Sequence, residues 1–487
     1  MRHLSFELLE LIAEHCQSSN DLSQLSRVNH QYHVASTRIL FNRVAIKTPQ
    51  QYAALMGHRD LFRKRGWLKY VRRLDLSSYS ARGSGWTEAK AKAIVEPHAL
   101  AQLLIDCVYL TELYVGEEMM QAFVEPIVIR AIFNGHPRLE VLDFTGFCDR
   151  KFTDVMAHVF GGNNDNQQQQ QHKSIKQQQK EIWDREGILP FMMEDEEEEE
   201  EKDLLALESQ LPENTMMPPR LNRISFYMCM ALSQSSFFIP FFGQLSNNQL
   251  TRLDLANTKI TSDLFQHLDP TCLTHLNLQG CHGVSCCSLF LPFLEQAKEL
   301  IELNLNMSFS GVGGSNFCSD CLAHLVSIDM PHLRTLNLGG HGHMNDHVLS
   351  NVHPQNARRL EYFSLASTKQ VTVDALLKLL GGMSQLKYLN LSRTWFILDL
   401  KYLASILSST RTDEKQVSGI SPTLKVIEVS PESRYPQQIH DWTLVHHGRR
   451  SYYSRDQVDP RFFYSNKLLL LDEIPVSPMT KYWSYSN

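Results

Sequence analysis

The sequence predicts an α/β solenoid in which each repeat contributes one strand and one helix. Three observations support this prediction: a spaced leucine pattern that recurs along the chain, helical segments between its copies, and an N-terminal segment that does not follow it. The chain has 487 residues, 43% hydrophobic and 21% charged, which is typical of a globular protein. Its formal net charge of −6 leaves no basic surplus that would indicate nucleic-acid binding.

The leucine pattern is L-x-x-L-x-L, and its six clear copies begin 23, 27, 33, 27 and 26 residues apart. The clear copies are Leu250-Leu253-Leu255, Leu273-Leu276-Leu278, Leu300-Leu303-Leu305, Leu333-Leu336-Leu338, Leu360-Phe363-Leu365 and Leu386-Leu389-Leu391. Weaker copies are Val71-Leu74-Leu76, Leu110-Leu113-Val115, Leu139-Leu142-Phe144, Leu221-Ile224-Phe226 and Leu424-Ile427-Val429. This spacing is the pattern of leucine-rich repeats.

Each copy is expected to form a short strand with its leucines on the buried side. Residues two apart on a strand face the same side, so the last two anchors of a copy enter one core. Segments such as residues 373–380 return as helices, because their apolar residues recur at helical spacing. Cys229 and Cys281 fall eight residues after the first leucine of their copies, where a small side chain can turn the chain inward. One repeat cannot cover its own apolar face, so neighbours must stack.

The positions that alternate with the strand leucines should face away from the core and offer a binding surface. A surface made by many strands suits a protein or folded peptide better than a metabolite. Asparagine recurs between the leucines as part of the repeat pattern, so several of these asparagines are expected to be structural. The expected target contacts are Arg252, His275, Glu302, Tyr362 and Tyr388. With one arginine among them, they argue against a phosphate-reading surface.

Residues 1–47 predict three short helices instead of a repeat. Ser5 can cap a helix that continues through His15, and Asn20-Asp21 can cap a second. Asn29 begins a third segment. The alternative role for this segment is a cap that shields the first repeat, because solenoids need polar-faced terminal caps.

The same segment resembles the F-box. The resemblance lies in Leu4-Ser5-Phe6-Glu7-Leu8-Leu9, Ile12, Asp21-Leu22 with Leu25, Arg27-Val28-Asn29 with Tyr32, and Ile39-Leu40-Phe41-Asn42-Arg43-Val44. It departs at Ser5, where the family has proline. An F-box followed by leucine-rich repeats is similar to the layout of substrate receptors in SCF-type ubiquitin ligases. The resemblance implies a Skp-type adaptor and a cullin–RING scaffold as partners, with no catalysis and no cofactor in this chain. Eight residues are expected to divide between module core and adaptor interface: Leu4, Leu8, Leu9, Ile12, Leu22, Leu25, Val28 and Tyr32.

The expected organisation has five parts. They are an F-box-like helical module (1–47), N-terminal repeats (48–160), an insert (161–219), the main repeats (220–432) and an aromatic-rich C-terminal cap (433–487). The insert is glutamine-rich and then acidic, so we expect it to be disordered, either solvated or docked on a basic surface. The C-terminal aromatics are expected to pack over the final repeat, and an aromatic pocket beside His446 to Arg450 is the alternative.

The leading function is therefore target recognition for an SCF-type ubiquitin ligase. A repeat scaffold without a ligase role is the first alternative, and an enzyme with a site in the insert or tail is the second. Nothing at the N-terminus predicts a signal peptide, no window predicts a transmembrane helix, and the scattered cysteines predict reduced thiols. A cytoplasmic or nuclear location is expected, with no membrane and no nucleic acid among the partners.

Three further patterns resemble ligand sites, but none of them is complete. Cys318-Ser319-Asp320-Cys321 has zinc-ligand spacing and Cys286-Cys287 loosely so, but no second C-x-x-C exists, so these cysteines are expected to be small apolar helix residues. The histidines of His341-Gly342-His343, with His347, are expected in a polar loop. Gly311 to Gly314 lack the lysine of a phosphate loop. No metal, cofactor or catalytic residue is predicted.

Overall fold

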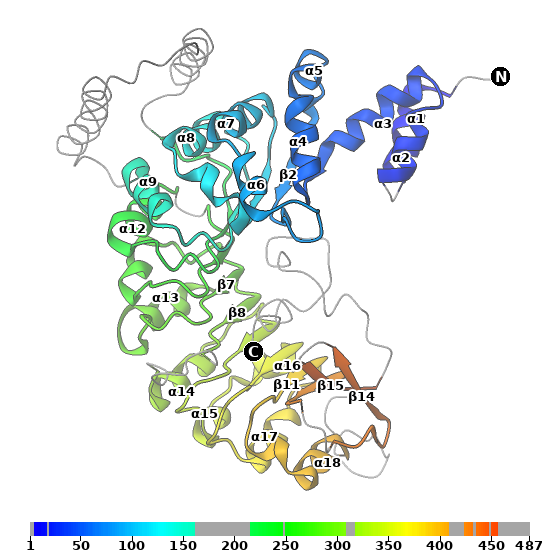
Figure 1. Ribbon diagram of the computed structural model, residues 1–487. Coiled ribbons are helices and arrows are strands. Elements are labelled where there is room, and N and C mark those ends of the chain that lie inside the picture. Colours follow the sequence, from blue (N-terminus) through cyan, green and yellow to red (C-terminus); the bar gives the residue numbers. More distant parts are fainter. Residues whose placement is uncertain are drawn as a thin grey trace. The chain divides into compact units, whose positions relative to one another are not determined.

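The computed structural model describes residues 4–16, 19–160, 215–246, 249–307, 317–408, 423–431, 435–447 and 450–455. The chain divides into two compact units, Met1–Leu221 with Ser235–Leu245 and Asn222–Gln234 with Ser246–Asn487. Most of the predicted insert and the last 32 residues (456–487) lie outside the described residues. Both units consist of short parallel strands joined by helices (Figure 1), which confirms the α/β leucine-rich-repeat solenoid.

The first unit begins with three helices and continues into a parallel ladder of four strands. The helices are α1 (Phe6–Glu14), α2 (Ser19–Leu25) and α3 (His30–Asn42), and the strands are β1 (Arg43–Ala45), β2 (Arg73–Leu76), β3 (Glu112–Val115) and β4 (Val141–Phe144). The other elements are α4 (Pro49–Gly57), α5 (Arg59–Lys64), η1 (Leu68–Tyr70), α6 (Glu88–Ala93), α7 (Pro97–Asp106), η2 (Glu117–Phe123), α8 (Pro126–Gly135), α9 (Arg150–Phe160), most of η3 (Gln234–Phe238) and α12 (Ile239–Gly243).

Strand β1 was not expected, because the N-terminal module was predicted to be entirely helical. Its residues pair in parallel with β2, with Val44 opposite Leu74. A strand edge presents backbone N–H and C=O groups that need partners, and β1 supplies them for β2. The end of the N-terminal module is therefore built into the sheet.

The second unit contains eight parallel strands and an antiparallel end. The parallel strands are β5 (Arg223–Ser225), β6 (Arg252–Asp254), β7 (His275–Asn277), β8 (Glu302–Asn304), β9 (Thr335–Asn337), β10 (Tyr362–Ser364), β11 (Tyr388–Asn390) and β12 (Val426–Val429). Strands β15 (Arg450–Ser454), β14 (Trp442–His447) and β13 (Gln438–Ile439) follow β12 in antiparallel order. The helical elements are η4 (Ser262–His267), η5 (Cys286–Phe290), α13 (Leu291–Gln296), α14 (Ser319–Ser327), α15 (Asp346–Ser350), α16 (Pro354–Arg359), α17 (Val373–Leu380), η6 (Phe396–Leu398) and α18 (Leu400–Ser408).

All eleven predicted leucine frames are confirmed as strands. They coincide with β2 to β12, and none of their anchor residues is more than 5% exposed. The middle anchors stand opposite one another from strand to strand, as Leu253, Leu276 and Leu303 do in β6 to β8. Each repeat thus continues the core of its neighbour. None of the helices in the described ranges is long and apolar enough to cross a membrane.

In five repeats of the second unit, a polar side chain ends the strand and fixes the turn that follows. The Oδ1 atom of Asn277 accepts a hydrogen bond from the backbone N–H of Gln279, two residues further on, at 3.1 Å. Asp254, Asn304, Asn337 and Asn390 make the same bond in their own repeats. All five side chains are buried. The prediction that several of these asparagines are structural is confirmed.

Several repeats bury a hydrogen-bonding side chain eight residues after their first leucine. The thiol of Cys281 contacts the Leu255 carbonyl oxygen at 3.0 Å, and Thr258 bonds to that same carbonyl oxygen at 2.6 Å. His341 fills the position with a larger ring, whose Nε2 lies 2.8 Å from the Leu305 carbonyl oxygen. Burial lowers the pKa of His341 to about 4. This histidine therefore belongs to the core and not to the polar loop that was expected.

The buried histidine makes the fold sensitive to acid. Unfolding restores an ordinary pKa of about 6.5 to His341, so the unfolded chain takes up more protons between that pH and about pH 4. Stability from the neutral ring is complete above pH 6.5 and falls as the pH drops. Thr368 fills the same position in a later repeat. We expect His341→Thr to reduce the loss of unfolding free energy on acidification by on the order of 3 kcal/mol. Urea unfolding of both proteins at pH 7.5 and pH 4.5 measures this difference, and an equal pH dependence in both would contradict the prediction.

The antiparallel end of the second unit buries its aromatic side chains and one ion pair. Trp442, Tyr452 and Tyr453 are at most 1% exposed. The Arg450 guanidinium donates to both carboxylate oxygens of Glu428 on β12, at 2.9 and 2.8 Å, and to the Tyr388 hydroxyl at 3.1 Å. The pair joins β15 to the last parallel strands.

Breaking this pair should be costly, because removing one partner leaves a buried charge. We expect Arg450→Met to lower the free energy of unfolding by about 3–5 kcal/mol. The control is Lys387→Met: Lys387 bonds to Glu361, the residue before β10, but its side chain is 43% exposed, so a loss of about 1 kcal/mol or less is expected. Urea denaturation compares the two, and similar losses would show that burial does not set the strength of the Arg450 pair.

Candidate functional site

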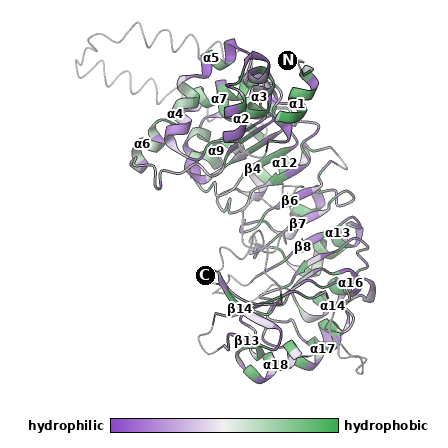
Figure 2. Ribbon diagram, turned by 90° about the vertical axis from the view of Figure 1, so that its right-hand side faces the viewer, coloured by the Kyte–Doolittle hydropathy of each residue, from purple (hydrophilic) through white to green (hydrophobic). Residues whose placement is uncertain are grey.

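Helix α1 has two apolar faces, and only one of them is buried. Leu9 and Ala13 are buried on the side that packs against α3. Leu4, Leu8, Leu11 and Ile12 are between 42% and 49% exposed. The spacing of Leu8, Leu11 and Ile12 places these three together on another side of the helix, and Leu4 lies just before the N-cap residue. We call these four residues the α1 apolar face. Figure 2 shows the hydrophobic colouring of α1 in the first unit.

The eight residues predicted for the module divide between core and surface. Leu9 and Leu22 are buried, Leu25 and Tyr32 are half-buried, and Val28 is exposed along with Leu4, Leu8 and Ile12. Leu11 was missed. Its place one helical turn after Leu8 is a signal that could have found it.

The rest of the module holds α1 in position. The third segment begins at Asn29, as the sequence predicts, and the Asn29 side chain caps α3 by accepting a hydrogen bond from the backbone N–H of Tyr32 at 3.0 Å. An ion pair between Arg38 on α3 and Glu10 joins α3 to α1. Ser5 occupies the N-cap position of α1, but its side chain makes no capping bond. The Ser5 backbone has a φ of −66°, which is the value that a proline ring imposes.

The five predicted target contacts lie in one row of the second unit. Residues at the same level of β6, β7, β8, β10 and β11 are aligned by the strand pairing, with Thr335 of β9 completing the row. Glu302, Tyr362 and Tyr388 are buried, so little of their side-chain surface is open to a partner. Arg252 and His275 are half-buried. Burial, aided by the Arg252 charge, lowers the pKa of His275 to about 3, so its ring is neutral at physiological pH.

An open pocket of about 670 Å³ lies in the first unit where the strands end. Its walls come from the segments that follow β2, β3 and β4. The pocket residues are Ala81, Arg82, Trp86, Glu88, Lys92, Glu117, Glu118, Met120, Gln121, Val124, Asp149 and Lys151. Glu118 shapes one wall by bonding to the Ser80 hydroxyl and the Ala81 backbone N–H at 2.7 and 2.8 Å. No sequence pattern predicted this pocket, although Trp86 in a long loop after a strand marks it.

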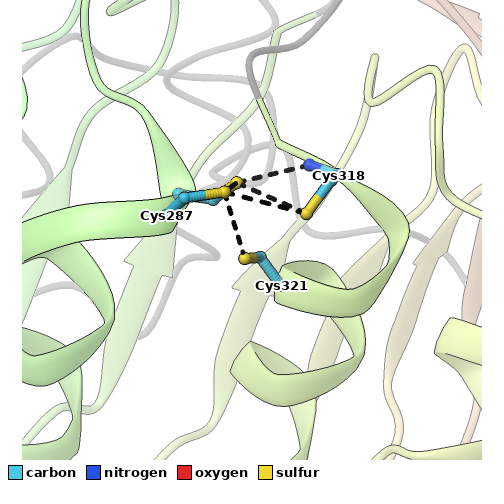
Figure 3. Close-up of side chains that lie close together, drawn as sticks. Cys287, Cys318 and Cys321 are labelled. Atoms are coloured by element: carbon cyan, nitrogen blue, oxygen red, sulfur yellow. Dashed lines mark hydrogen bonds between the residues drawn. The ribbon is translucent and has the colours of Figure 1, made fainter.

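A cluster of four cysteines occupies the second unit, and Figure 3 labels three of them, Cys287, Cys318 and Cys321. The thiols of these three and of Cys286 all lie within 4.8 Å of one another. A hydrogen bond from the Cys321 backbone N–H lowers the pKa of Cys318 to about 7, whereas burial raises the pKa of Cys286 to about 11. Cys318 and Cys321 were expected to be small apolar helix residues, because the C-x-x-C pair lacked a second C-x-x-C. The structure instead gathers their thiols with those of the vicinal Cys286-Cys287 pair, and Cys318 is exposed.

The histidine cluster and the glycine-rich segment give no comparable geometry. The described residues contain no second cluster of metal-ligating side chains, and His341 is buried against a carbonyl oxygen. Gly311 to Gly314 lie outside the described residues.

Comparison with known proteins places the chain in no family. No protein-family model matches it. No curated protein matches it. Among solved structures it is similar to a chain of the Rad7 and Elc1 complex in yeast, at 14% identity and a TM-score of 0.47, covering 89% of this chain and 90% of that one. It is also similar to the leucine-rich-repeat-containing protein LegL7 from Legionella pneumophila (13%, TM-score 0.32, coverage 71% and 88%) and to an internalin, inlF, from Listeria monocytogenes (13%, TM-score 0.34, coverage 77% and 78%). Such low identities and TM-scores carry no argument about function.

The backbone at Ser5 predicts that proline fits there. Because φ is already −66°, Ser5→Pro should restrict the unfolded chain without straining the folded one. We expect it to stabilise the N-terminal module by about 0.4–1 kcal/mol. Hydrogen exchange of the α1 amides measures this locally, and faster exchange in the variant would contradict it.

Proposed function

We propose that this protein is the target-recognition subunit of an SCF-type ubiquitin ligase. The α1 apolar face is the observation that carries the proposal. It would bind a Skp-type adaptor, and a cullin–RING scaffold would then join through the adaptor. The repeats would hold a target protein, and ubiquitin transfer would be catalysed by other subunits.

The α1 apolar face favours adaptor binding over a purely structural cap. A terminal cap covers the end repeat of the stack with one side and presents a polar side to water. In this module, β1 already closes the edge of β2, and α1 buries Leu9 and Ala13 on α3. The α1 apolar face is needed for neither task. Half-exposed leucines at helical spacing are the usual means by which one helix docks on a partner.

The size of a stable interface indicates that α1 does not act alone. A typical complex buries about 800 Å² on each partner, which is more than four side chains provide. Val28 after α2 is 62% exposed and Tyr32 on α3 is half-buried, so both can extend the surface. The Ser5 departure from the F-box pattern leaves the backbone in the proline conformation, so it does not disturb the geometry of α1.

For the target, the pocket in the first unit is the better-formed surface. It combines three basic side chains (Arg82, Lys92 and Lys151) with four acidic ones and an indole. Such mixed walls suit a peptide segment that carries both charges and an apolar anchor. Arg252 and His275 remain proposed contacts in the second unit.

The adaptor surface can be tested by reversing its polarity. We expect Leu8→Asp with Ile12→Asp to abolish binding to a purified Skp-type adaptor, because both carboxylates would be buried at the interface without partners. The measurement is a pull-down or calorimetric titration with the full-length chain.

Leu61→Asp is the matched control. Leu61 is 45% exposed on α5 of the same unit, outside the α1 apolar face, so adaptor affinity should be unchanged. Circular dichroism should show the same helix content in all variants. Undiminished adaptor binding by the folded double variant would refute the proposed interface.

A repeat scaffold without a ligase role is the second candidate. It predicts that the adaptor binds without a cullin, or that neither binds. An enzyme with a site in the insert or tail is the third, and those segments lie largely outside the described residues. Assembly with purified adaptor and cullin distinguishes the first two directly.

A further inference from the structure

Four cysteine thiols from two neighbouring repeats meet in the second unit. Cys286 and Cys287 begin the π-helical turn η5, Cys318 is the N-cap residue of α14, and Cys321 lies in its first turn. Figure 3 shows the side chains of Cys287, Cys318 and Cys321 pointing toward one another. Because α14 belongs to the repeat after η5, the cluster bridges two repeats.

We propose that these four cysteines bind one Zn²⁺ ion as a structural site. Neither the repeat fold nor adaptor binding requires this site, so it stands apart from the proposed function. Zinc is bound tetrahedrally by thiolates at about 2.3 Å, which places neighbouring sulfur atoms about 3.8 Å apart. In the structure, the Sγ distances are 3.8 Å for Cys286–Cys318, 3.9 Å for Cys287–Cys318 and 3.5 Å for Cys287–Cys321.

The vicinal pair is the tightest edge of the cluster. The Sγ atoms of Cys286 and Cys287 are 3.2 Å apart, so a small side-chain rotation would bring this edge to the tetrahedral value. None of the four residues forms a disulfide, and their sulfur–sulfur separations far exceed a disulfide bond of about 2.05 Å. A π-helical turn is uncommon and is often found where a chain forms a functional site.

Burial disfavours the thiolate form of Cys286, and two backbone features at the cluster oppose this effect. The backbone N–H of Cys318 donates to the Sγ of Cys286 at 3.3 Å, a bond that stabilises negative charge on a ligand sulfur. The N-terminus of α14, a helix of nine residues, directs its positive dipole end at the cluster. Cys286 is buried whereas Cys287 is exposed, so an ion can reach the site from solvent.

The donor set selects the type of ion and its role. Soft thiolates favour zinc over magnesium or calcium, which prefer oxygen ligands. Four protein ligands leave no position for a reactive water, so the site is structural. Binding replaces thiol protons, which are released to solvent, and the complex of Zn²⁺ with four thiolates carries a charge of −2. The ion would fasten η5 to α14 and strengthen the interface on which adjacent repeats depend.

Metal analysis of the full-length protein tests the site. Protein purified under reducing conditions should contain about one zinc per chain, measured by mass spectrometry of the element. Replacement by Co²⁺ should give the intense visible absorption of tetrahedral cobalt with thiolate charge-transfer bands. Cys287→Ser and Cys321→Ser should weaken Zn²⁺ binding by more than about 100-fold, because losing even a supporting partner costs 10–100-fold.

Cys272→Ser is the matched control, since Cys272 is a free cysteine of the same unit outside the cluster. It should keep the zinc. A chelator should lower the unfolding temperature of the wild-type chain and of Cys272→Ser, but not that of Cys287→Ser. Cys287 is exposed, so its replacement should fold even if that of Cys321 does not.

Two results would overturn the proposal. One is a reduced, folded wild-type chain that takes up neither Zn²⁺ nor Co²⁺, or takes them up equally after Cys287→Ser. The other is a Cys287–Cys321 disulfide, found by peptide mapping, whose reduction does not restore metal uptake.

Discussion

The structure depends on one constraint: a single repeat cannot bury its own apolar face. The anchors of each leucine frame are buried because the adjacent strand continues the same core. The parallel backbone bonds set the level of each repeat, and the buried polar side chains at the strand ends fix the turns. The same constraint explains why His341 and Cys281 share a position despite their different chemistry, since both satisfy a backbone carbonyl inside the stack.

A stack of this kind must end somewhere, and its end strands need partners for their backbone groups. In the first unit, β1 of the N-terminal module pairs with β2. In the second, the antiparallel strands β15 and β14 follow β12, and the buried Arg450–Glu428 pair joins them to it. The N-terminal module therefore combines two roles in our account: its strand closes the sheet, and its first helix keeps an apolar face for a partner. Deleting the module would disturb both, so point substitutions test the second role more cleanly.

The sequence predicted what depends on local periodicity and missed what depends on neighbours. Leucine spacing located the eleven strands β2 to β12, since alternation on a strand is a property of consecutive residues. Strand β1 was missed because three residues carry no repeat pattern, and only their pairing with β2 defines them. The zinc spacing of Cys318 and Cys321 was visible, but their nearness to Cys286 and Cys287 depends on how two repeats stack. Tyr388 was expected to meet a target, whereas Glu428 and Arg450, distant in sequence, cover its hydroxyl.

The central claim is that the α1 apolar face connects this repeat protein to a ubiquitin ligase. The most direct measurement is affinity purification of the intact chain from cells beside the Leu8→Asp, Ile12→Asp variant, with co-purifying proteins identified by mass spectrometry. Our account predicts that a Skp-type adaptor and a cullin accompany only the intact chain, while target proteins held by the repeats accompany both. Recovery of adaptor and cullin with both chains, or with neither, would contradict it.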